Sequence, residues 1–339
     1  MSSIEDEIVY SAERVRRPTA PPLGSGYRAP LRDRIAERVI LSLSLVAVLA
    51  IALIFFFIAK EALPLFVEWE AQREIGGMAA LFSPRQWAYY DEPVFVWQPV
   101  GETGKFNVIP LFVGTLKITL LGMLFATPLA ILAAVFVSQY ASKRARDIIK
   151  PIIELLASVP SVVLGFFALM LLASFVQNLF GLTYRLNAIV AGLGLAIAIA
   201  PVIFTIADDA IRAVPVDLER AALALGARKY QVVMRVVLPA ALPGLAAATI
   251  LGFGRAIGET MIVLMASGNA AVMEIFDPTT SARTVTATIA SELGEVTQGD
   301  AHWRVLFLLG AMLFVVTFII HRVAAIVVAR LQRRLTAAS

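Results

Sequence analysis

Two opposite charges, Arg255 and Glu259, interrupt an otherwise apolar run between residues 236 and 267. A charged side chain at the centre of a bilayer costs roughly 2.5–3.5 kcal/mol, so it is expected to face a pathway or a partner. If the run is one helix, a spacing of four places both charges on one face, beside the hydroxyl of Thr260. The planar guanidinium can bind an oxyanion through two parallel hydrogen bonds. The pattern predicts an oxyanion pathway at Arg255, Glu259 and Thr260; the alternative is a buried ion pair that only locks helix packing.

Two glycines, Gly254 and Gly258, stand four residues apart around this arginine. Small residues at that spacing allow the backbone of another helix to come close. The pattern predicts a tight helix contact next to Arg255.

The polar segment between residues 208 and 238 has the pattern of two short helices joined by a turn. Pro215 precedes residues of good helix propensity, and Gly226 follows them, as is typical of a helix end. Ala221 and Ala222 give this helix–turn–helix a low surface profile that suits docking. The alternative is an ordinary solvated loop.

The elements that must position these residues are long apolar runs. Hydrophobic residues make up 59% of the 339, and they gather in stretches that reach the roughly 20 residues needed to cross a bilayer. The first run is too long, and follows too acidic a start, to be a cleaved signal peptide. An all-α membrane protein with six spans is predicted, at about residues 39–59, 108–140, 152–176, 188–207, 236–267 and 305–328.

The basic residues predict the orientation of these spans. With the N-terminus in the cytoplasm, 20 of the 29 Lys and Arg fall on the cytoplasmic side and seven on the other, with Lys117 and Arg255 inside spans. Cytoplasmic loops are enriched in these residues, so both termini are expected on the cytoplasmic side of the membrane. The predicted parts are a disordered cytoplasmic tail (1–36), a first transmembrane helix (37–59), a periplasmic loop (60–107), a transmembrane domain (108–330) with the loop 208–238, and a cytoplasmic tail (331–339).

Several kinds of site are missing from the sequence. It has no cysteine and no Gly-x-x-x-x-Gly-Lys-Ser/Thr loop, so thiolate metal sites and a P-loop for ATP are excluded. The two histidines, His302 and His321, stand at opposite ends of the last run and cannot share a metal. They, and the acids Asp208 and Asp209, are expected to be solvated. No metal, cofactor or nucleic-acid partner is predicted, and no enzymatic site within this chain.

The loop 208–238 resembles the EAA signature of binding-protein-dependent ABC importer permeases. Its alanines, its glycine and the Leu238–Pro239 pair fall at the family's intervals. The resemblance implies docking on a cytoplasmic ATPase subunit. Arg220 occupies the family's glutamate position, with Glu219 one residue earlier. The docking residues implied are Glu219, Arg220, Ala221, Ala222 and Gly226.

Two further stretches resemble the phosphate permease subunits of the bacterial Pst importer. They are GRAIGETM, at residues 254–261, and IELLASVPSVVLGFFAL, at residues 153–169; the methionine after GET is typical of PstC-like subunits. The resemblance covers about residues 109–328. It implies a core of five helices with a peripheral first helix, and ATP-driven import of inorganic phosphate. It also implies a heterodimer with a sister permease, two ATPase subunits and a periplasmic phosphate-binding protein.

Other functions remain open at this point. The chain could be a permease for another oxyanion, such as molybdate or sulfate, or the sister phosphate permease subunit. A membrane-embedded enzyme would need clustered His, Asp or Ser at one membrane depth, and a secondary carrier would favour paired broken helices in two related halves. Neither pattern is evident in the sequence.

Overall fold

The computed structural model describes residues 31–87, 90–101, 103–271 and 273–337. Within these ranges, six helical segments are long and apolar enough to cross a membrane, which confirms the predicted number. They are Leu31–Val67, Ile109–Tyr140, Ser161–Phe180, Ala188–Arg212, Lys229–Ile257 and Ala301–Arg330.

The chain divides into two compact units, residues 1–54 and 55–339. In its described part, the first unit consists of the beginning of helix α2 (Leu31–Ala62). This helix starts at Leu31, so residues 31–36, assigned above to a disordered tail, are helical. Asp33 lies in its first turn, where a negative charge complements the helix dipole. The rest of that tail lies outside the described residues.

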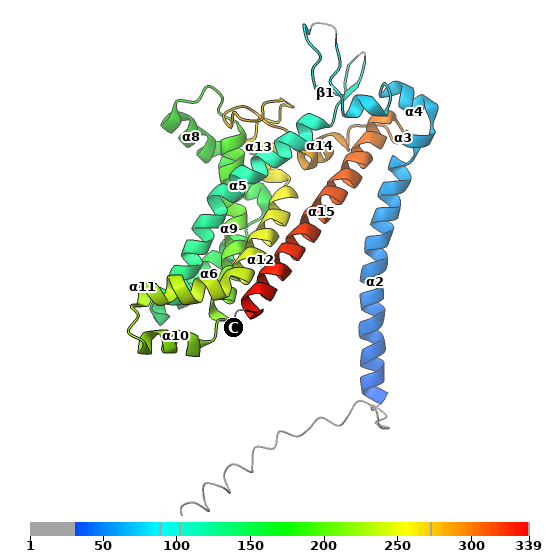
Figure 1. The fold of residues 1–339 in the computed structure, drawn as a ribbon. Coiled ribbons are helices and arrows are strands. Elements are labelled where there is room, and N and C mark those ends of the chain that lie inside the picture. Colours follow the sequence, from blue (N-terminus) through cyan, green and yellow to red (C-terminus); the bar gives the residue numbers. More distant parts are fainter. Residues whose placement is uncertain (1–30, 88–89, 102, 272, 338–339) are drawn as a thin grey trace, which may run out of the picture. The chain divides into compact units, whose positions relative to one another are not determined.

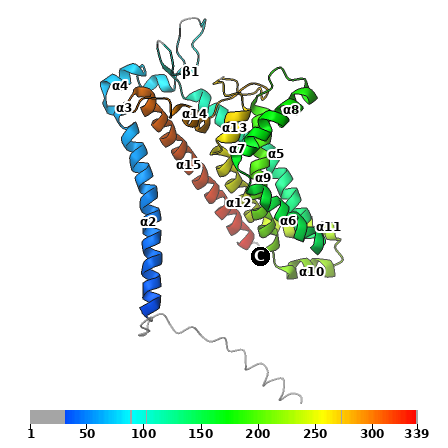
Figure 2. The ribbon, with the colours of Figure 1, turned by 180° about the vertical axis from the view of Figure 1, so that it is seen from behind.

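The core of the second unit is formed by α5 (Ile109–Val135), α9 (Ala188–Arg212) and α12 (Leu238–Ile257). Helix α9 is the most buried of the spans and packs against both α5 and α12. A Cβ on Gly192 of α9 would lie 2.7 Å from Cβ of Leu121 on α5, so the glycine is what allows these helices to touch. Figures 1 and 2 show α12 between α9 and α15 (Ala301–Ala337).

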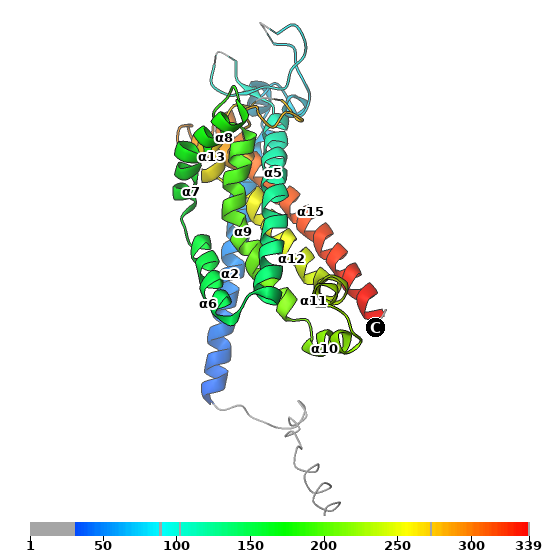
Figure 3. The same cartoon turned by 90° about the vertical axis from the view of Figure 1, so that its left-hand side faces the viewer.

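The third span differs from the predicted one. An amphipathic helix, α6 (Lys143–Ala157), comes first, and the span begins only at Ser161 with α7 (Ser161–Phe167), η3 (Ala168–Leu172) and α8 (Ala173–Phe180). The predicted start at residue 152 is wrong because Pro160 has an extended backbone and separates α6 from α7. Figure 3 shows α6 and α7 along one flank of this unit and α15 along the other.

The second unit has two distinct ends (Figure 1). One, called here the hairpin end, carries α3 (Pro64–Val67), α4 (Trp69–Glu74), η1 (Met78–Leu81), the antiparallel strands β1 (Trp97–Gln98) and β2 (Lys105–Phe106), and α14 (Val285–Glu292). Leu65, Trp97, Leu111 and Leu306 share an apolar core there, so the segment 60–107 is folded onto α5 and α15.

The opposite end, called here the coupling end, carries η2 (Phe136–Tyr140), α10 (Val216–Ala224), α11 (Lys229–Val232) and η4 (Val233–Val237). Helix α15 also ends there and continues to Ala337. The segment 331–337, assigned above to a tail, is therefore a continuation of this helix.

Candidate substrate site and coupling surface

The fifth span is broken where the sequence predicted one helix. Helix α12 ends at Ile257, Gly258 caps it, and a separate helix, α13 (Met261–Ala266), follows after Glu259 and Thr260. The hydroxyl of Thr286 donates to the backbone oxygen of Glu259 at 3.0 Å, and the Glu259 carboxylate accepts from its neighbour's amide at 3.2 Å. The carboxylate of Glu259 is thus held in the break, outside the helix that carries Arg255.

Arg255 lies in the last turn of α12 with its side chain exposed. Within the described part of the chain, no ion pair joins it to Glu259, so the expected pairing on one helix face is not formed. Because only Gly258 separates Glu259 and Thr260 from the end of α12, the three candidate residues still border the same break. A guanidinium exposed on a membrane span is expected to face a pathway or another subunit.

The predicted tight contact beside Arg255 is found at Gly254. A Cβ there would lie 2.5 Å from the His321 ring of α15, so only glycine allows this approach. Nδ1 of His321 lies 2.9 Å from the backbone oxygen of Thr317. His321 is therefore partly buried against α12 rather than solvated. Gly258, by contrast, has only atoms of its own helix within 4 Å of an added Cβ.

The loop 208–238 forms the predicted pair of helices, α10 and α11. Helix α10 ends in a Schellman motif, in which the amide of Gly226 donates to Leu223 O at 2.9 Å and that of Ala227 to Ala222 O at 3.2 Å. Gly226 has φ +82°, a left-handed conformation that other residues adopt only at a cost. No atom lies within 4 Å of an added Cβ at Gly226, so the backbone alone requires glycine there.

The two residues around the family's glutamate position face different ways. The Glu219 carboxylate accepts a hydrogen bond from Nε2 of Gln139, in η2, at 3.3 Å. Arg220 is exposed and pairs only loosely with the exposed Asp217, at 3.7 Å. Glu219 therefore ties α10 to the spans, whereas Arg220 points into the surroundings of the coupling end.

Asp208 is not solvated as expected, because its side chain is completely buried. Its carboxylate pairs with Nζ of Lys150 on α6 at 3.0 Å and with Nε of Arg212 at 2.9 Å. Burial lowers the pKa of Lys150, but its hydrogen bonds to Asp208 and to the exposed Asp209 outweigh that effect and raise the pKa above its ordinary value. This cluster lies directly before α10.

A second polar cluster, at the hairpin end, is centred on Glu292 of α14. Its carboxylate accepts from Nη2 of Arg283 at 2.6 Å and from Nε1 of Trp97 at 3.1 Å, and lies 2.9 Å from Nε2 of His302. The expectation that His302 is solvated is therefore wrong. Neither cluster was predicted, because residues far apart in the sequence form each of them.

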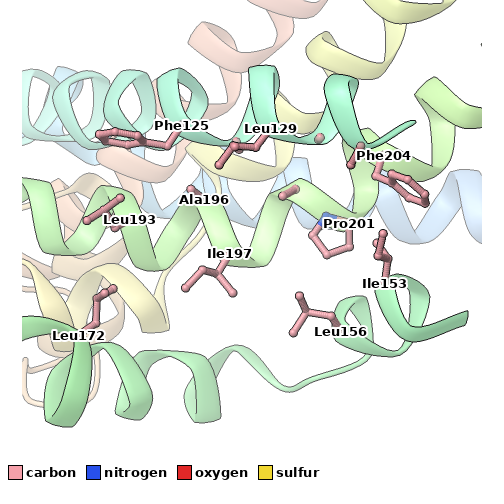
Figure 4. Close-up of a pocket in the computed structure, with 14 residues that line it drawn as sticks. Phe125, Leu129, Ile153, Leu156, Leu172, Leu193, Ala196, Ile197, Pro201 and Phe204 are labelled. Carbon is pink, nitrogen blue, oxygen red and sulfur yellow. The ribbon is translucent and has the colours of Figure 1, made fainter. Parts of the chain in front are cut away.

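An apolar cavity of about 420 Å³ lies between α5, α6, α9 and η3. Figure 4 shows Phe125 and Leu129 of α5 on one side of α9, and Ile197 of α9 directed to the other side, toward Leu156 of α6. Every described residue that lines it is apolar. An oxyanion would find no hydrogen-bond donor there, so this cavity is not the substrate site.

The sequence matches the family described as "Binding-protein-dependent transport system inner membrane component" over residues 126–335, more than half of the chain. Its fold is shared with a bacterial ABC transporter involved in the import of the acidic polysaccharide alginate. That structure has a TM-score of 0.56 and 18% identity, with 88% of this chain and 99% of the other covered.

Curated relatives are similar over about two thirds of the chain. The "Probable ABC transporter permease protein YqgH" of Bacillus subtilis is 35% identical, covering 66% of this chain and 72% of the relative. The "Phosphate transport system permease protein PstC" of Mesorhizobium japonicum is 34% identical, covering 70% and 77%. The similarity to PstC-like subunits that the sequence motifs predicted is confirmed.

These relatives are permease subunits, and the six apolar helices are those of a multi-pass inner-membrane protein. The chain therefore belongs to the binding-protein-dependent transport system inner membrane component family and is a permease subunit of an ABC importer.

Proposed function

We propose that this chain is the PstC-like subunit of an ATP-driven importer of inorganic phosphate. Its partners would be a sister permease, two cytoplasmic ATPase subunits and a periplasmic phosphate-binding protein. The coupling end and both termini would face the cytoplasm, and the hairpin end the periplasm. The observation that carries the proposal is Arg255, an exposed guanidinium within the motif that PstC-like subunits share, at the break of a membrane span.

Phosphate would be bound transiently beside this break. The guanidinium of Arg255 offers two parallel hydrogen bonds to an oxyanion, and the low dielectric of the membrane strengthens their attraction. Glu259 stands two residues beyond the end of α12 and repels the anion, which favours its release. Thr260, the residue after Glu259, supplies a hydroxyl beside the same break.

Coupling to ATP hydrolysis would occur at α10 and α11. Large apolar side chains are exposed there at the end of the bundle: Leu225 is 90% exposed, Tyr230 56% and Leu223 51%. Exposed apolar groups rimmed by charges are typical of a protein interface. The Schellman motif at Gly226 fixes the angle at which both helices would enter the ATPase.

Delivery by a binding protein agrees with the charge of the opposite end. The segments predicted to be periplasmic contain twelve Asp or Glu but only seven Lys or Arg. Such a surface repels a free dianion and lowers its local concentration. Phosphate carried inside a binding protein is shielded from this field until it is released.

The test is reconstitution in proteoliposomes with the four candidate partners. Uptake of radiolabelled phosphate is measured with ATP inside, against excess unlabelled phosphate, molybdate or sulfate. Uptake that excess unlabelled phosphate abolishes, and that equal molybdate or sulfate leaves unchanged, is expected. No uptake of labelled phosphate, with uptake of labelled molybdate or sulfate, would assign the importer to that oxyanion, and uptake without ATP would contradict an ABC mechanism.

A further inference from the structure

The buried Asp208 cluster joins the coupling end to the membrane spans. Asp208 lies in the last full turn of α9, with no exposed side-chain surface, and Arg212 four residues later reaches its Oδ1. Helix α10 starts at Val216, only four residues beyond Arg212. Lys150 pairs with the other carboxylate oxygen of Asp208 and brings in α6.

Helix α6 also holds the end of the second span. Arg146, one turn before Lys150, donates from Nε to Val137 O at 3.1 Å and from Nη2 to Ser138 O at 2.6 Å. These carbonyls belong to η2, whose next residue, Gln139, donates to Glu219 of α10. The contacts close a ring that runs through α9, α6, η2 and α10.

From α6 the chain of contacts continues to the break in the fifth span. Helix α6 leads through Ser158 and Pro160 into α7. A Cβ on Gly165 of α7 would lie 3.1 Å from Met261 O and 3.2 Å from the Cα of Ile262, so α7 rests directly on the backbone of α13. Helix α13 begins one residue after Thr260.

We infer that the Asp208–Lys150 ion pair is the link through which a displacement of α10 reaches α6, the third span and the break beside Arg255. The inference rests on the proposed function, because it requires α10 to be moved by an ATPase. Separating the pair would leave a fully buried carboxylate without one of its two cations, so α6 and α9 move together. Asp208 and Lys150 act as positioning residues and do not touch the substrate.

The test uses Lys150→Gln in the reconstituted complex. This variant removes the link but keeps the Asp208–Arg212 pair, so Asp208 retains a cation. Phosphate uptake and ATP hydrolysis are measured together, with the amount of assembled complex. Uptake per ATP hydrolysed is expected to fall at least about fivefold, while binding-protein-stimulated hydrolysis persists, because the two sites lose their coupling free energy.

Two matched variants complete the experiment. Lys150→Arg keeps the charge and should retain the wild-type ratio of uptake to hydrolysis. Asp209→Asn removes the exposed partner of Lys150, which is 65% exposed, and should also retain it. An unchanged ratio in Lys150→Gln would overturn the inference, even if less complex is assembled, because that is the outcome of a purely structural pair. A wild-type complex that fails to import phosphate would instead contradict the proposed function.

Discussion

Arg255 is the only arginine or lysine in the second half of the fifth span, and it stands at an exposed position of the isolated chain. With Glu259 held in the break, Arg255 has no ion pair among the described residues that must open before it can meet an anion. A helical run through residue 267 would have placed the two charges on one face and made them a neutral pair. The break therefore favours a role in the pathway over a role in packing.

Arg255→Gln should leave the complex assembled and reduce phosphate uptake by tenfold or more, since hydrogen bonds to a charged group contribute about 1.5–3 kcal/mol. Uptake in cells and the membrane level of the variant are measured together. Adding Glu259→Gln to Arg255→Gln should not restore uptake, because the two side chains are not paired in the described structure. Wild-type uptake in the double variant would show that they act only as a structural pair.

Substitution of Gly226 tests whether the left-handed turn between α10 and α11 shapes the docking surface. Gly226→Val should weaken ATPase association by roughly tenfold, because a left-handed conformation costs about 1–2 kcal/mol for a residue with a Cβ. Gly226→Asn is the control, since asparagine tolerates this conformation best among the other residues. Equal association of the two variants would mean that the left-handed turn does not shape the docking surface.

At the scale of the elements, the sequence predicts the spans well, because their apolar runs are long. It also predicts α10, again from a local signal: a proline before the helix and a glycine after it mark its ends. Gly258 carries a comparable stop signal inside the fifth run, but the apolar residues on both sides obscured it. Pro160 likewise marks the true start of the third span.

The polar clusters could not be predicted in this way. Lys150 and Asp208 are 58 residues apart, and Trp97 and Glu292 are 195 apart. Their pairing depends on which helices become neighbours, and no local propensity encodes that. The expectation of solvated Asp208 and His302 failed because a charge near a span end was assumed to reach water.

The contact between α12 and α15 can be tested at Gly254. Gly254→Val should lower the thermal unfolding midpoint of the solubilised complex, because overpacking a tight contact costs about 1–3 kcal/mol. His321→Ala in the same chain should restore most of the loss by removing the ring that the valine meets. Gly258→Val is the matched control and should lower the midpoint less, as only its own helix lies near.

The Glu292 cluster joins three elements of the hairpin end. Glu292→Gln leaves Arg283, which is 17% exposed, without its ionic partner, and breaking a buried pair costs about 3–5 kcal/mol. Faster proteolysis of the segment 97–106 is therefore expected. Glu295→Gln, which alters an exposed carboxylate nearby, should leave the cleavage rate unchanged. Equal rates for both variants would mean that Glu292 does not hold the hairpin.

At the scale of the whole molecule, Arg255 is not enclosed by the part of the chain that the structure describes. Arg255 is exposed on the surface of the isolated chain, and so are Val163 and Phe166 of the third span, each at 55%. A dianion at such a surface would meet lipid on its open side, and the cost of that exposure is prohibitive. A second permease subunit packed against Arg255 would supply the missing wall.

The chain reconstituted alone should therefore take up no phosphate and hydrolyse no ATP, whereas addition of a sister permease, the ATPase and a loaded binding protein should establish both activities. The full complex containing Arg255→Gln is the control, because it should hydrolyse ATP while its phosphate uptake is reduced tenfold or more. Since the sequence has no cysteine, a single cysteine at Val163 can also report the contact. It should react with a membrane-permeant maleimide in the isolated chain and become protected when the sister subunit is present. Uptake by the chain alone at the rate of the full complex would mean that one bundle suffices, and an unprotected cysteine would place the sister subunit on another face.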